Sequence, residues 1–353
     1  SVLAGEPQNS KRPCLPWNPG KTMQDNHSPD GTAFHTGFIA IVGRPKVGKS
    51  TLMNRLIGRK VSIVSSKAQT TRHRVSGILT DDTAQFVFVD TPGFQTRHQN
   101  ALNRTMNRTV TQSLADVDLV YLVIEAGKFG PEDEQVVALL PRDAKVILVI
   151  NKVDTVADKS SLLPFIERVR GAFPFTEIVP LSAERGKNVD ALLAVSRTYL
   201  PEGPPMFGPD DVTDRSERFL AAEFLREKLF RLLGDELPYG MTVEIERFEA
   251  DGGLRRINAA IIVDKPGHKG IVIGKGGEHL KRISTEARKA MEELFGAKIY
   301  LEVWGKVKSG WADDERALKS LGYDCVSAPW ARSSASINNP VLCFTPTRIG
   351  KPA

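Results

Sequence analysis

Gly43-Arg44-Pro45-Lys46-Val47-Gly48-Lys49-Ser50 fits G-x-x-x-x-G-K-[ST], the pattern of a phosphate-binding loop. The apolar run Phe38–Val42 before it predicts a buried strand, and residues 51–57 after it have the apolar spacing of a helix. In this context the backbone amides of the loop and the N-terminus of the helix point at a bound polyphosphate. We therefore predict that Lys49 contacts the β- and γ-phosphates of a nucleotide and that Ser50 binds Mg²⁺.

The composition is that of a globular protein with 353 residues, of which 41% are hydrophobic and 25% charged. This length favours two domains. We find no apolar run near the roughly 20 residues that span a bilayer, and residues 1–36 lack the apolar core of a secretory signal. Cys14, Cys325 and Cys343 have no metal-binding spacing, so we expect a reducing, cytoplasmic compartment without structural disulfides.

Four segments are expected. Residues 1–36 and 324–353 have few large apolar side chains and predict flexible tails, and the dense prolines at 201–205 separate domains at 37–203 and 204–323. In the first domain strands alternate with helices, which predicts an α/β fold with a mostly parallel sheet of six strands. The short turn at 81–83 predicts one antiparallel hairpin. The predicted strands are Phe38–Val42, Arg74–Leu79, Gln85–Asp90, Leu119–Glu125, Lys145–Asn151 and Glu177–Leu181.

The second domain is predicted to be α+β. Asp214 and Glu217 resemble a capping box for an amphipathic helix that buries Phe219, Leu220, Phe224, Leu225, Leu229 and Leu232. The segments that follow predict strands at 242–248 and 256–263, a glycine loop after an apolar segment, a helix at 277–295, a strand at 298–304 and a polar helix at 313–321.

Three further motifs lie at the ends of predicted strands. Asp90-Thr91-Pro92-Gly93 offers an acid for Mg²⁺ and the Gly93 amide for the γ-phosphate. In Asn151-Lys152-Val153-Asp154 a carboxylate beside an amide can accept hydrogen bonds from guanine, while Ser182-Ala183-Glu184 could offer backbone amides to guanine O6. Each motif alone also describes a simple turn. Their order along the chain favours guanine nucleotide binding, because ligands bind at this edge of such sheets.

The segment from Arg55 to Arg74 contains six basic residues and no acid. We expect one of its threonine hydroxyls to complete the Mg²⁺ shell when the γ-phosphate is present. Thr71 is favoured and Thr70 is the second choice. The alternative is a basic surface loop.

The run from Lys67 to Arg74, taken with Asp90-Thr91-Pro92-Gly93, resembles the Era family of bacterial GTPases, within the TRAFAC class, over about residues 38–323. The resemblance implies a Ras-like G domain and catalytic roles for Lys49, Thr71 and Gly93. It also implies a Mg²⁺ site made by Ser50, Thr71 and Asp90. The predicted contacts with GTP or GDP are Gly43, Arg44, Pro45, Lys46, Val47, Gly48, Lys49, Ser50, Thr51, Asp90, Thr91, Pro92, Gly93, Asn151, Lys152, Asp154, Ser182 and Ala183.

Two positions bear on the rate of hydrolysis. Phe94 stands where Ras-like proteins have the glutamine that orients the attacking water, so we expect slow intrinsic hydrolysis. Lys46 departs from the asparagine usual in the Era family, which in some relatives helps to bind K⁺. We expect that the activity of this chain depends little on K⁺.

The glycine loop of the second domain, Gly274-Lys275-Gly276-Gly277, fits the G-x-x-G pattern with which KH domains clamp single-stranded nucleic acid. The net charge of +6 does not identify an RNA-binding half, since residues 204–323 have 20 Lys/Arg against 21 Asp/Glu. Residues 264–289, however, have seven basic against three acidic residues. A simple helix-entry turn is the alternative, but the β–β–α–β order resembles a type II KH domain. The predicted RNA contacts are Ile271, Ile273, Gly274, Lys275, Gly276, Gly277, Lys281 and Arg282.

The resemblance implies a GTPase that binds 16S rRNA near its 3′ end, assists maturation of the 30S ribosomal subunit, and couples bound GTP to the placement of its domains. It further implies a cytoplasmic monomer with peripheral contact to the inner membrane. The competing class is a signalling GTPase whose second domain docks a protein. A third reading, an RNA clamp with an inactive G domain, is disfavoured because Lys49, Ser50, Asp90, Asn151 and Asp154 are all present.

Overall fold

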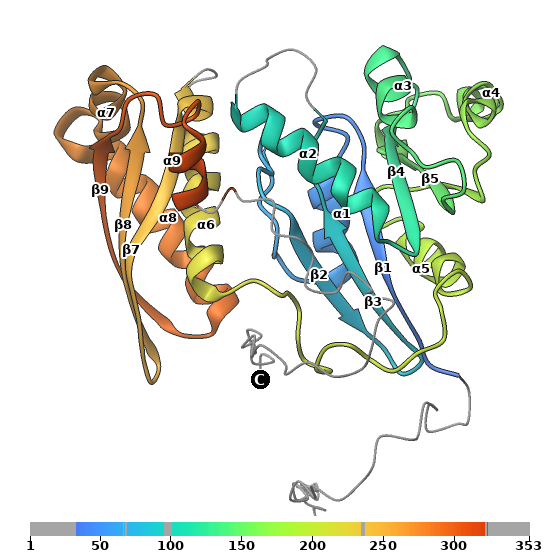
Figure 1. Cartoon of the computed structure of the whole chain (residues 1–353), viewed down its shortest axis with the longest axis horizontal. Coiled ribbons are helices and arrows are strands. Elements are labelled where there is room, and N and C mark those ends of the chain that lie inside the picture. Colours follow the sequence, from blue (N-terminus) through green and yellow to red (C-terminus); the bar gives the residue numbers. More distant parts are fainter. Residues whose placement is uncertain are drawn as a thin grey trace, which may run out of the picture.

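The computed structural model describes residues 33–65, 67, 69–94, 101–233, 237–321 and 323. The predicted tails, apart from residues 33–36, lie outside these residues. Figure 1 shows two units side by side, a sheet with helices on both faces and a smaller sheet with helices packed against it. No helix within the described residues has the length and apolarity to cross a membrane.

The first sheet has six strands in the order β2-β3-β1-β4-β5-β6, which confirms the predicted fold class. All its pairings are parallel except that of β2 with β3, and this pair forms the predicted hairpin. Each predicted strand is present with small shifts at its ends. The bounds are β1 His35–Val42, β2 Val75–Thr80, β3 Ala84–Asp90, β4 Leu119–Glu125, β5 Val146–Asn151 and β6 Glu177–Pro180.

Alternate residues of the central strands supply two hydrophobic cores, one on each face of this sheet. In β1, Ile39 and Ile41 pack under α1 and α5, whereas Ala40 and Val42 pack under α2, α3 and α4. Burial on both faces explains why these strands are continuous apolar runs. The helices are α1 Lys49–Ile57, α2 Ala101–Ala115, α3 Pro131–Val137, α4 Leu162–Val169 and α5 Val189–Arg197, with 3-10 turns at Val153–Thr155, Lys159–Ser161 and Arg170–Ala172.

The chain after the dense prolines stays against the first sheet. The Ile78 amide donates to Val212 O at 2.9 Å, and Thr213 Oγ1 donates to Ser76 O at 2.7 Å, so this segment follows the outer edge of β2. The predicted boundary between residues 203 and 204 therefore stays a prediction.

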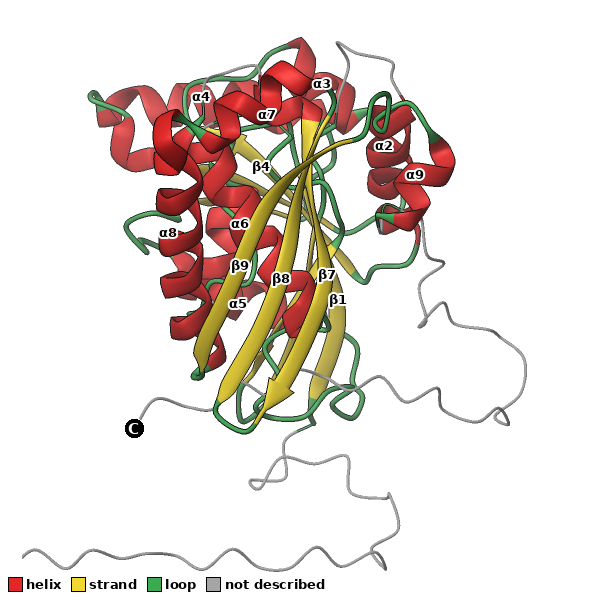
Figure 2. Ribbon diagram, turned by 90° about the vertical axis from the view of Figure 1, so that its left-hand side faces the viewer, coloured by secondary structure: helices red, strands yellow, loops and turns green. Residues whose placement is uncertain are grey.

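The second unit has a three-stranded sheet in the order β7-β8-β9, with β7 antiparallel and β9 parallel to β8. Figure 2 shows this sheet with α6 and α8 packed beside it. The apolar segment before the glycine loop is a helix, α7, which was not predicted; Pro266 occupies its first turn, where a missing amide costs nothing. The elements are α6 Glu217–Leu232, β7 Met241–Asp251, β8 Leu254–Val263, α7 Pro266–Ile273, α8 Glu278–Phe295, β9 Lys298–Val307 and α9 Glu315–Ser320, with 3-10 turns at Leu237–Gly240 and Lys275–Gly277.

Two predictions about α6 were wrong. Its N-cap is Ser216, whose side chain accepts from the Phe219 amide, and not Asp214. The helix is also not amphipathic in its burial: Phe219 and Leu232 are only partly buried, whereas Glu223, Arg226, Glu227 and Lys228 are buried. The reason is that α6 lies between the sheet of the second unit and the first unit, so its charged face is covered by another part of the chain.

Charged partners compensate the burial of this face. Arg226 forms a two-bond ion pair with Glu223, at 2.8 and 2.6 Å. Glu227, which has no exposed surface, pairs with Lys60 of the first unit at 2.5 Å and accepts from the Val64 amide at 3.0 Å. Since an unpaired buried charge is strongly destabilising, the two bonds of Glu227 help to fix how the units dock, whereas the Glu223–Arg226 pair lies within α6.

His73 lies in the same contact between the units. Its ring stacks on Tyr323 with centroids 4.3 Å apart and meets the edge of Phe219 at 5.3 Å. Burial lowers the pKa of His73 to about 4; the nearby Glu223 opposes this shift, while Arg226, Arg215 and Arg72 add to it. The imidazole is therefore neutral wherever the chain is folded near neutral pH.

We expect the free energy of unfolding to fall as the pH drops from 6.5 to about 4. In this window the unfolded chain binds a proton at His73 that the folded chain does not bind. Above pH 6.5 the residue is neutral in both states and adds no pH dependence. The free energy of unfolding should fall by about 2 kcal/mol. This is less than the full pKa shift would give, because the ring is partly exposed. Urea unfolding of His73→Gln between pH 4 and 7 should give a flatter profile than the parent chain, and equal slopes would contradict the assignment.

Candidate functional site

The phosphate-binding loop joins β1 to α1 and can be formed only with glycine at two positions. A Cβ on Gly43 would lie 2.4 Å from Val123 O, and one on Gly48 would lie 2.4 Å from Asn151 Nδ2. Gly48 also has a φ of 101°, which side chains other than glycine rarely adopt. Helix α1 begins at Lys49, so its free amides and positive end face the loop.

Lys49 is the cation at the centre of the loop. Its side chain is buried, and Nζ donates to Gly43 O at 2.9 Å and to Arg44 O at 3.0 Å. Burial lowers its pKa to about 8, although the negative charge of Asp90 raises it. A phosphate would replace the two carbonyl partners with a full negative charge, which favours the protonated amine.

Ser50, Thr71 and Asp90 come together from three separate segments. Ser50 Oγ is 2.6 Å from Asp90 Oδ2 and 2.8 Å from Thr71 Oγ1, and Thr71 Oγ1 is 3.4 Å from the same carboxylate oxygen. Thr70, the second choice, donates to Lys67 O instead. Asp90 has no exposed surface, and burial raises its pKa despite hydroxyl donation and the nearby Lys49.

These residues fit a magnesium ion. The second carboxylate oxygen, Asp90 Oδ1, is buried and has no hydrogen-bond partner among the described residues. Octahedral Mg²⁺ holds oxygen ligands at about 2.1 Å, so neighbouring ligands lie about 3 Å apart, close to the Ser50–Thr71 separation. The described residues contain no cluster of three or more His, Cys, Asp or Glu, so hydroxyl and phosphate oxygens would have to complete the shell.

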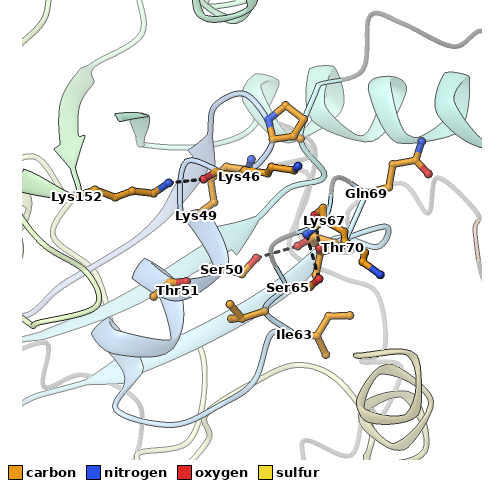
Figure 3. A pocket seen from close by; sticks show the side chains of 15 residues that line it. Lys46, Lys49, Ser50, Thr51, Ile63, Ser65, Lys67, Gln69, Thr70 and Lys152 are labelled. Carbon is orange, nitrogen blue, oxygen red and sulfur yellow. Dashed lines mark hydrogen bonds between the residues drawn. The ribbon is translucent and has the colours of Figure 1, made fainter. Parts of the chain in front are cut away.

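A pocket of about 320 Å³ opens beside this set (Figure 3). One wall is the phosphate-binding loop and the start of α1, and the opposite wall is the segment from Ile63 to Thr71. Four lysines from three parts of the sequence, Lys46, Lys49, Lys67 and Lys152, line it, so the pocket favours an anion.

The base-recognition motifs lie at the ends of β5 and β6, but several of their groups are already engaged. Asn151 joins three loops: its Nδ2 donates to Val47 O, and its Oδ1 accepts from the amides of Lys152 and Ala183. The Ala183 amide predicted to meet guanine is thus bonded to Asn151. Asp154 remains exposed, and a hydrogen bond from Ser182 lowers its pKa, so it is a carboxylate at neutral pH.

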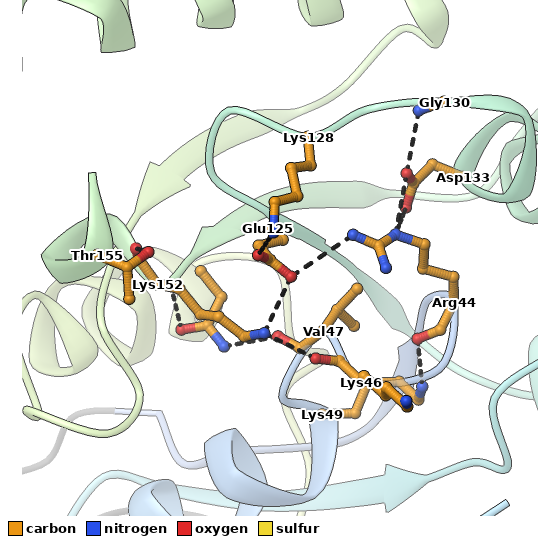
Figure 4. A network of polar contacts seen from close by, with 11 residues as sticks. Arg44, Lys46, Val47, Lys49, Glu125, Lys128, Gly130, Asp133, Lys152 and Thr155 are labelled. Carbon is orange, nitrogen blue, oxygen red and sulfur yellow. Dashed lines mark hydrogen bonds and ion pairs between the residues drawn. The ribbon is translucent and has the colours of Figure 1, made fainter. Parts of the chain in front are cut away.

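Glu125, the last residue of β4, connects the loop to these motifs (Figure 4). Its carboxylate pairs with Lys152 at 3.0 Å, Lys128 at 2.6 Å and Arg44 at 3.6 Å. Lys152 in turn donates to Lys46 O at 2.8 Å. The Arg44 side chain also pairs with Asp133 at 3.2 Å and so points away from the pocket, leaving only its backbone for a phosphate.

After β3 the chain passes close under the phosphate-binding loop. A Cβ on Gly93 would lie 3.0 Å from Pro45 Cα, so a side chain here would have to push the two segments slightly apart. Thr91 turns its hydroxyl to Ile41 O and is buried, which leaves only its backbone for the nucleotide. Phe94 packs partly against the core under α2. Residues 95–100 lie outside the described residues.

The glycine loop of the second unit joins α7 to α8. Gly274, Gly276 and Gly277 all have positive φ, and His279 Nδ1 lies 2.8 Å from Ile271 O across the loop. Lys275, Lys281 and Arg282 are exposed, and Arg282 pairs with Glu286 at 3.1 Å. Ile271 is 44% exposed although apolar, whereas Ile273 is partly buried. The loop and the helices beside it therefore expose backbone, cations and one apolar side chain.

Comparison with known proteins accounts for both units. The family model described as 50S ribosome-binding GTPase matches residues 38–152, and the KH domain model matches residues 236–312. GTPase Era of Nitrosomonas eutropha is 58% identical over 293 residues, which are 83% of this chain and 99% of that protein. GTPase Era of Chromobacterium violaceum gives the same identity and coverage.

The chain is a member of the GTPase Era family. It is accordingly a GTP-hydrolysing enzyme with a G domain and a KH domain. Two solved Era structures match with a TM-score of 0.79 and 40% identity, over 82% of this chain and 99% of theirs. One is a single-residue variant of Aquifex aeolicus Era bound to GDP·AlF4⁻. The other is Era in complex with MgGDPNP and nucleotides 1506–1542 of 16S ribosomal RNA.

Sequence reasoning missed three polar groups at the nucleotide site. Ser62 is buried and donates to Asp90 Oδ2 at 2.8 Å. Glu125 and Asp133 hold Arg44. Glu125 had a usable signal, because it is an acid at the carboxyl end of a buried strand, where ligands of such sheets bind. Ser62 had none, since it belongs to an irregular segment.

Asp154→Asn should weaken binding of GDP and GTP about 100-fold or more, because an amide cannot accept both guanine donors. Xanthine has an oxygen in place of the exocyclic amine, so binding of XTP should improve in the same variant. Calorimetric titration with the three nucleotides measures both effects. Asp158→Asn, another exposed aspartate four residues away, is the matched control and should leave guanine affinity unchanged. Unaltered GTP binding by Asp154→Asn would remove Asp154 from the base site.

Proposed function

We propose that this Era-family GTPase binds Mg²⁺ and GTP in the pocket beside the phosphate-binding loop. We further propose that its KH domain binds single-stranded RNA near the 3′ end of 16S ribosomal RNA and thereby assists maturation of the small ribosomal subunit. The observation that carries the RNA assignment is the likeness, over 82% of this chain, to an Era structure solved with MgGDPNP and that RNA. We expect it to act in the cytoplasm as a monomer, with at most peripheral contact to the inner membrane.

In this proposal the residues divide the chemistry as follows. Loop amides and Lys49 hold the phosphates, and Ser50, Thr71 and Asp90 hold the magnesium ion. When bound, the ion neutralises charge that develops between the β- and γ-phosphates. The Gly93 amide meets the γ-phosphate. Phe94 has no group that could orient a water molecule and packs towards the core, which supports slow intrinsic hydrolysis. Substrate discrimination rests on Asp154.

The RNA surface is supported by the geometry of the glycine loop. The space beside Gly276 and Gly277 is open, so the backbone there is accessible to a phosphate chain, and exposed cations stand within the loop and on the helix after it. Ile271 offers an apolar contact to an unstacked base. A protein-docking role would not need open backbone beside lysines, so the RNA reading is the better supported of the two.

We expect the double variant Lys275→Glu, Lys281→Glu to bind a single-stranded RNA of the 16S 3′ sequence at least tenfold more weakly. Both side chains are exposed, so the fold is retained. The slope of log affinity against log salt should decrease by roughly 1.4, since each lost phosphate contact removes about 0.7. Fluorescence anisotropy over a salt series measures both quantities, with Lys298→Glu, exposed at the far end of the domain, as control. If the double variant instead lost binding to a protein partner and kept its RNA affinity, a signalling GTPase whose second domain docks a protein would be favoured.

Lys46 lines the pocket, and its backbone carbonyl accepts a hydrogen bond from Lys152. Because a fixed cation repels a second one, exchanging Na⁺ for K⁺ should leave kcat for GTP almost unchanged. Lys46→Asn removes that charge and should gain several-fold in K⁺ over Na⁺. Steady-state GTP turnover in the two salts compares the two chains. A large K⁺ effect in the parent chain would overturn this expectation.

A further inference from the structure

The segment from Lys60 to Arg74, which carries Thr71, is bonded to the KH side of the molecule at several points. Near its start, the Val64 amide donates to Glu227 and Val64 O accepts from Arg231 Nε at 3.2 Å. Further along, Lys67 donates to Leu233 O. One wall of the nucleotide pocket is therefore held by a different domain from the one that contains the phosphate-binding loop.

The firmest of these contacts is made by Arg72, whose side chain is 2% exposed. Its guanidinium donates to Met241 O at 2.8 Å and to Tyr239 O at 3.1 Å. It also lies over the rings of Phe230 and Trp311, at 5.5 and 5.8 Å from their centroids. We call these contacts the Arg72 anchor.

A buried guanidinium is stable only when its donors are satisfied. The acceptors here are backbone carbonyls of Met241, the first residue of β7, and of Tyr239, in the 3-10 turn that leads into it. The Arg72 anchor is therefore complete only in one placement of the KH domain relative to this segment, and Arg72 is costly to hold in any other.

Thr71 and Arg72 are adjacent in the chain, but their side chains lie in different domains. The Thr71 hydroxyl lies 2.8 Å from Ser50 Oγ in the nucleotide site, while the next side chain enters the KH domain. Because one peptide unit separates them, a displacement of the backbone at Arg72 also displaces Thr71. Thr71 is needed only when the γ-phosphate is bound, so such a shift affects GTP and not GDP.

We propose that Arg72 is a positioning residue, which holds Thr71 at the magnesium site by anchoring its segment in the KH domain. This inference rests on the proposed role of Thr71. It makes the preference for GTP over GDP a property of both domains. By linkage, the placement of the KH domain that completes the anchor is favoured by GTP to the same extent.

Arg72→Gln in the full chain tests the proposal through nucleotide selectivity. With Mg²⁺ present, the Kd for a non-hydrolysable GTP analogue should rise about tenfold, since two hydrogen bonds from a charged donor are lost. The Kd for GDP should stay within the error of the parent chain. A merely structural role would weaken both nucleotides together, and that result would overturn the proposal.

Two further variants keep the outcome decisive. Phe230→Leu removes a ring of the anchor from the KH side without changing the segment that carries Thr71, and it should shift selectivity in the same direction. Thr213→Val removes a different buried hydrogen bond, from the segment after the prolines to Ser76 of β2, which is not part of the Arg72 anchor, and it should leave both affinities unchanged. If Arg72→Gln does not fold, the Phe230→Leu measurement decides.

Thr71→Ala separates this inference from the function on which it rests. If Thr71→Ala weakens the analogue selectively and neither anchor variant does, the Arg72 proposal is wrong while the magnesium role of Thr71 stands. If Thr71→Ala has no selective effect, the assignment of Thr71 fails first.

Discussion

A carboxylate without any exposed surface stands at the base of the nucleotide pocket, and much of the surrounding structure serves it. Asp90 ends β3 in the middle of a sheet buried on both faces, so water cannot reach it. Hydroxyls from Ser50, Ser62 and Thr71 share one of its oxygens and leave the other open. Such a charge is expensive in a dry site unless a cation joins it. The phosphate-binding loop, the segment that carries Thr71 and the end of β3 therefore meet at a carboxylate that needs a cation.

The sequence predicted the first domain well because its signals are local and repeated. Buried parallel strands are continuous apolar runs, and each is followed by a motif at the same edge of the sheet, so strand order and site location support one another. The order of the motifs along the chain was enough to predict that Ser50, Asp90 and Thr71 lie close together. The fold class and family followed from the same residues, whereas the individual site roles remain predictions.

The second domain was predicted less completely, because its short helix and its buried charges leave weak signals in the sequence. The apolar residues of α7 are too few for periodicity to separate a helix from an extended segment. The burial of the charged residues of α6 was not predicted, because partners such as Lys60 lie far away in the chain. The N-cap is Ser216 and not the predicted Asp214; both residue types cap helices, so sequence spacing does not separate them.

The shared position of α6 has a practical consequence for anyone who wishes to dissect this molecule. A KH fragment cut at the proline-rich stretch would carry α6 with Phe230 and the Glu223–Arg226 pair newly facing solvent. Newly bared aromatic and aliphatic surface of this kind promotes self-association. Studies of RNA binding with such a fragment would then measure a self-associating protein. Point substitution in the full chain is therefore the better experiment for this architecture.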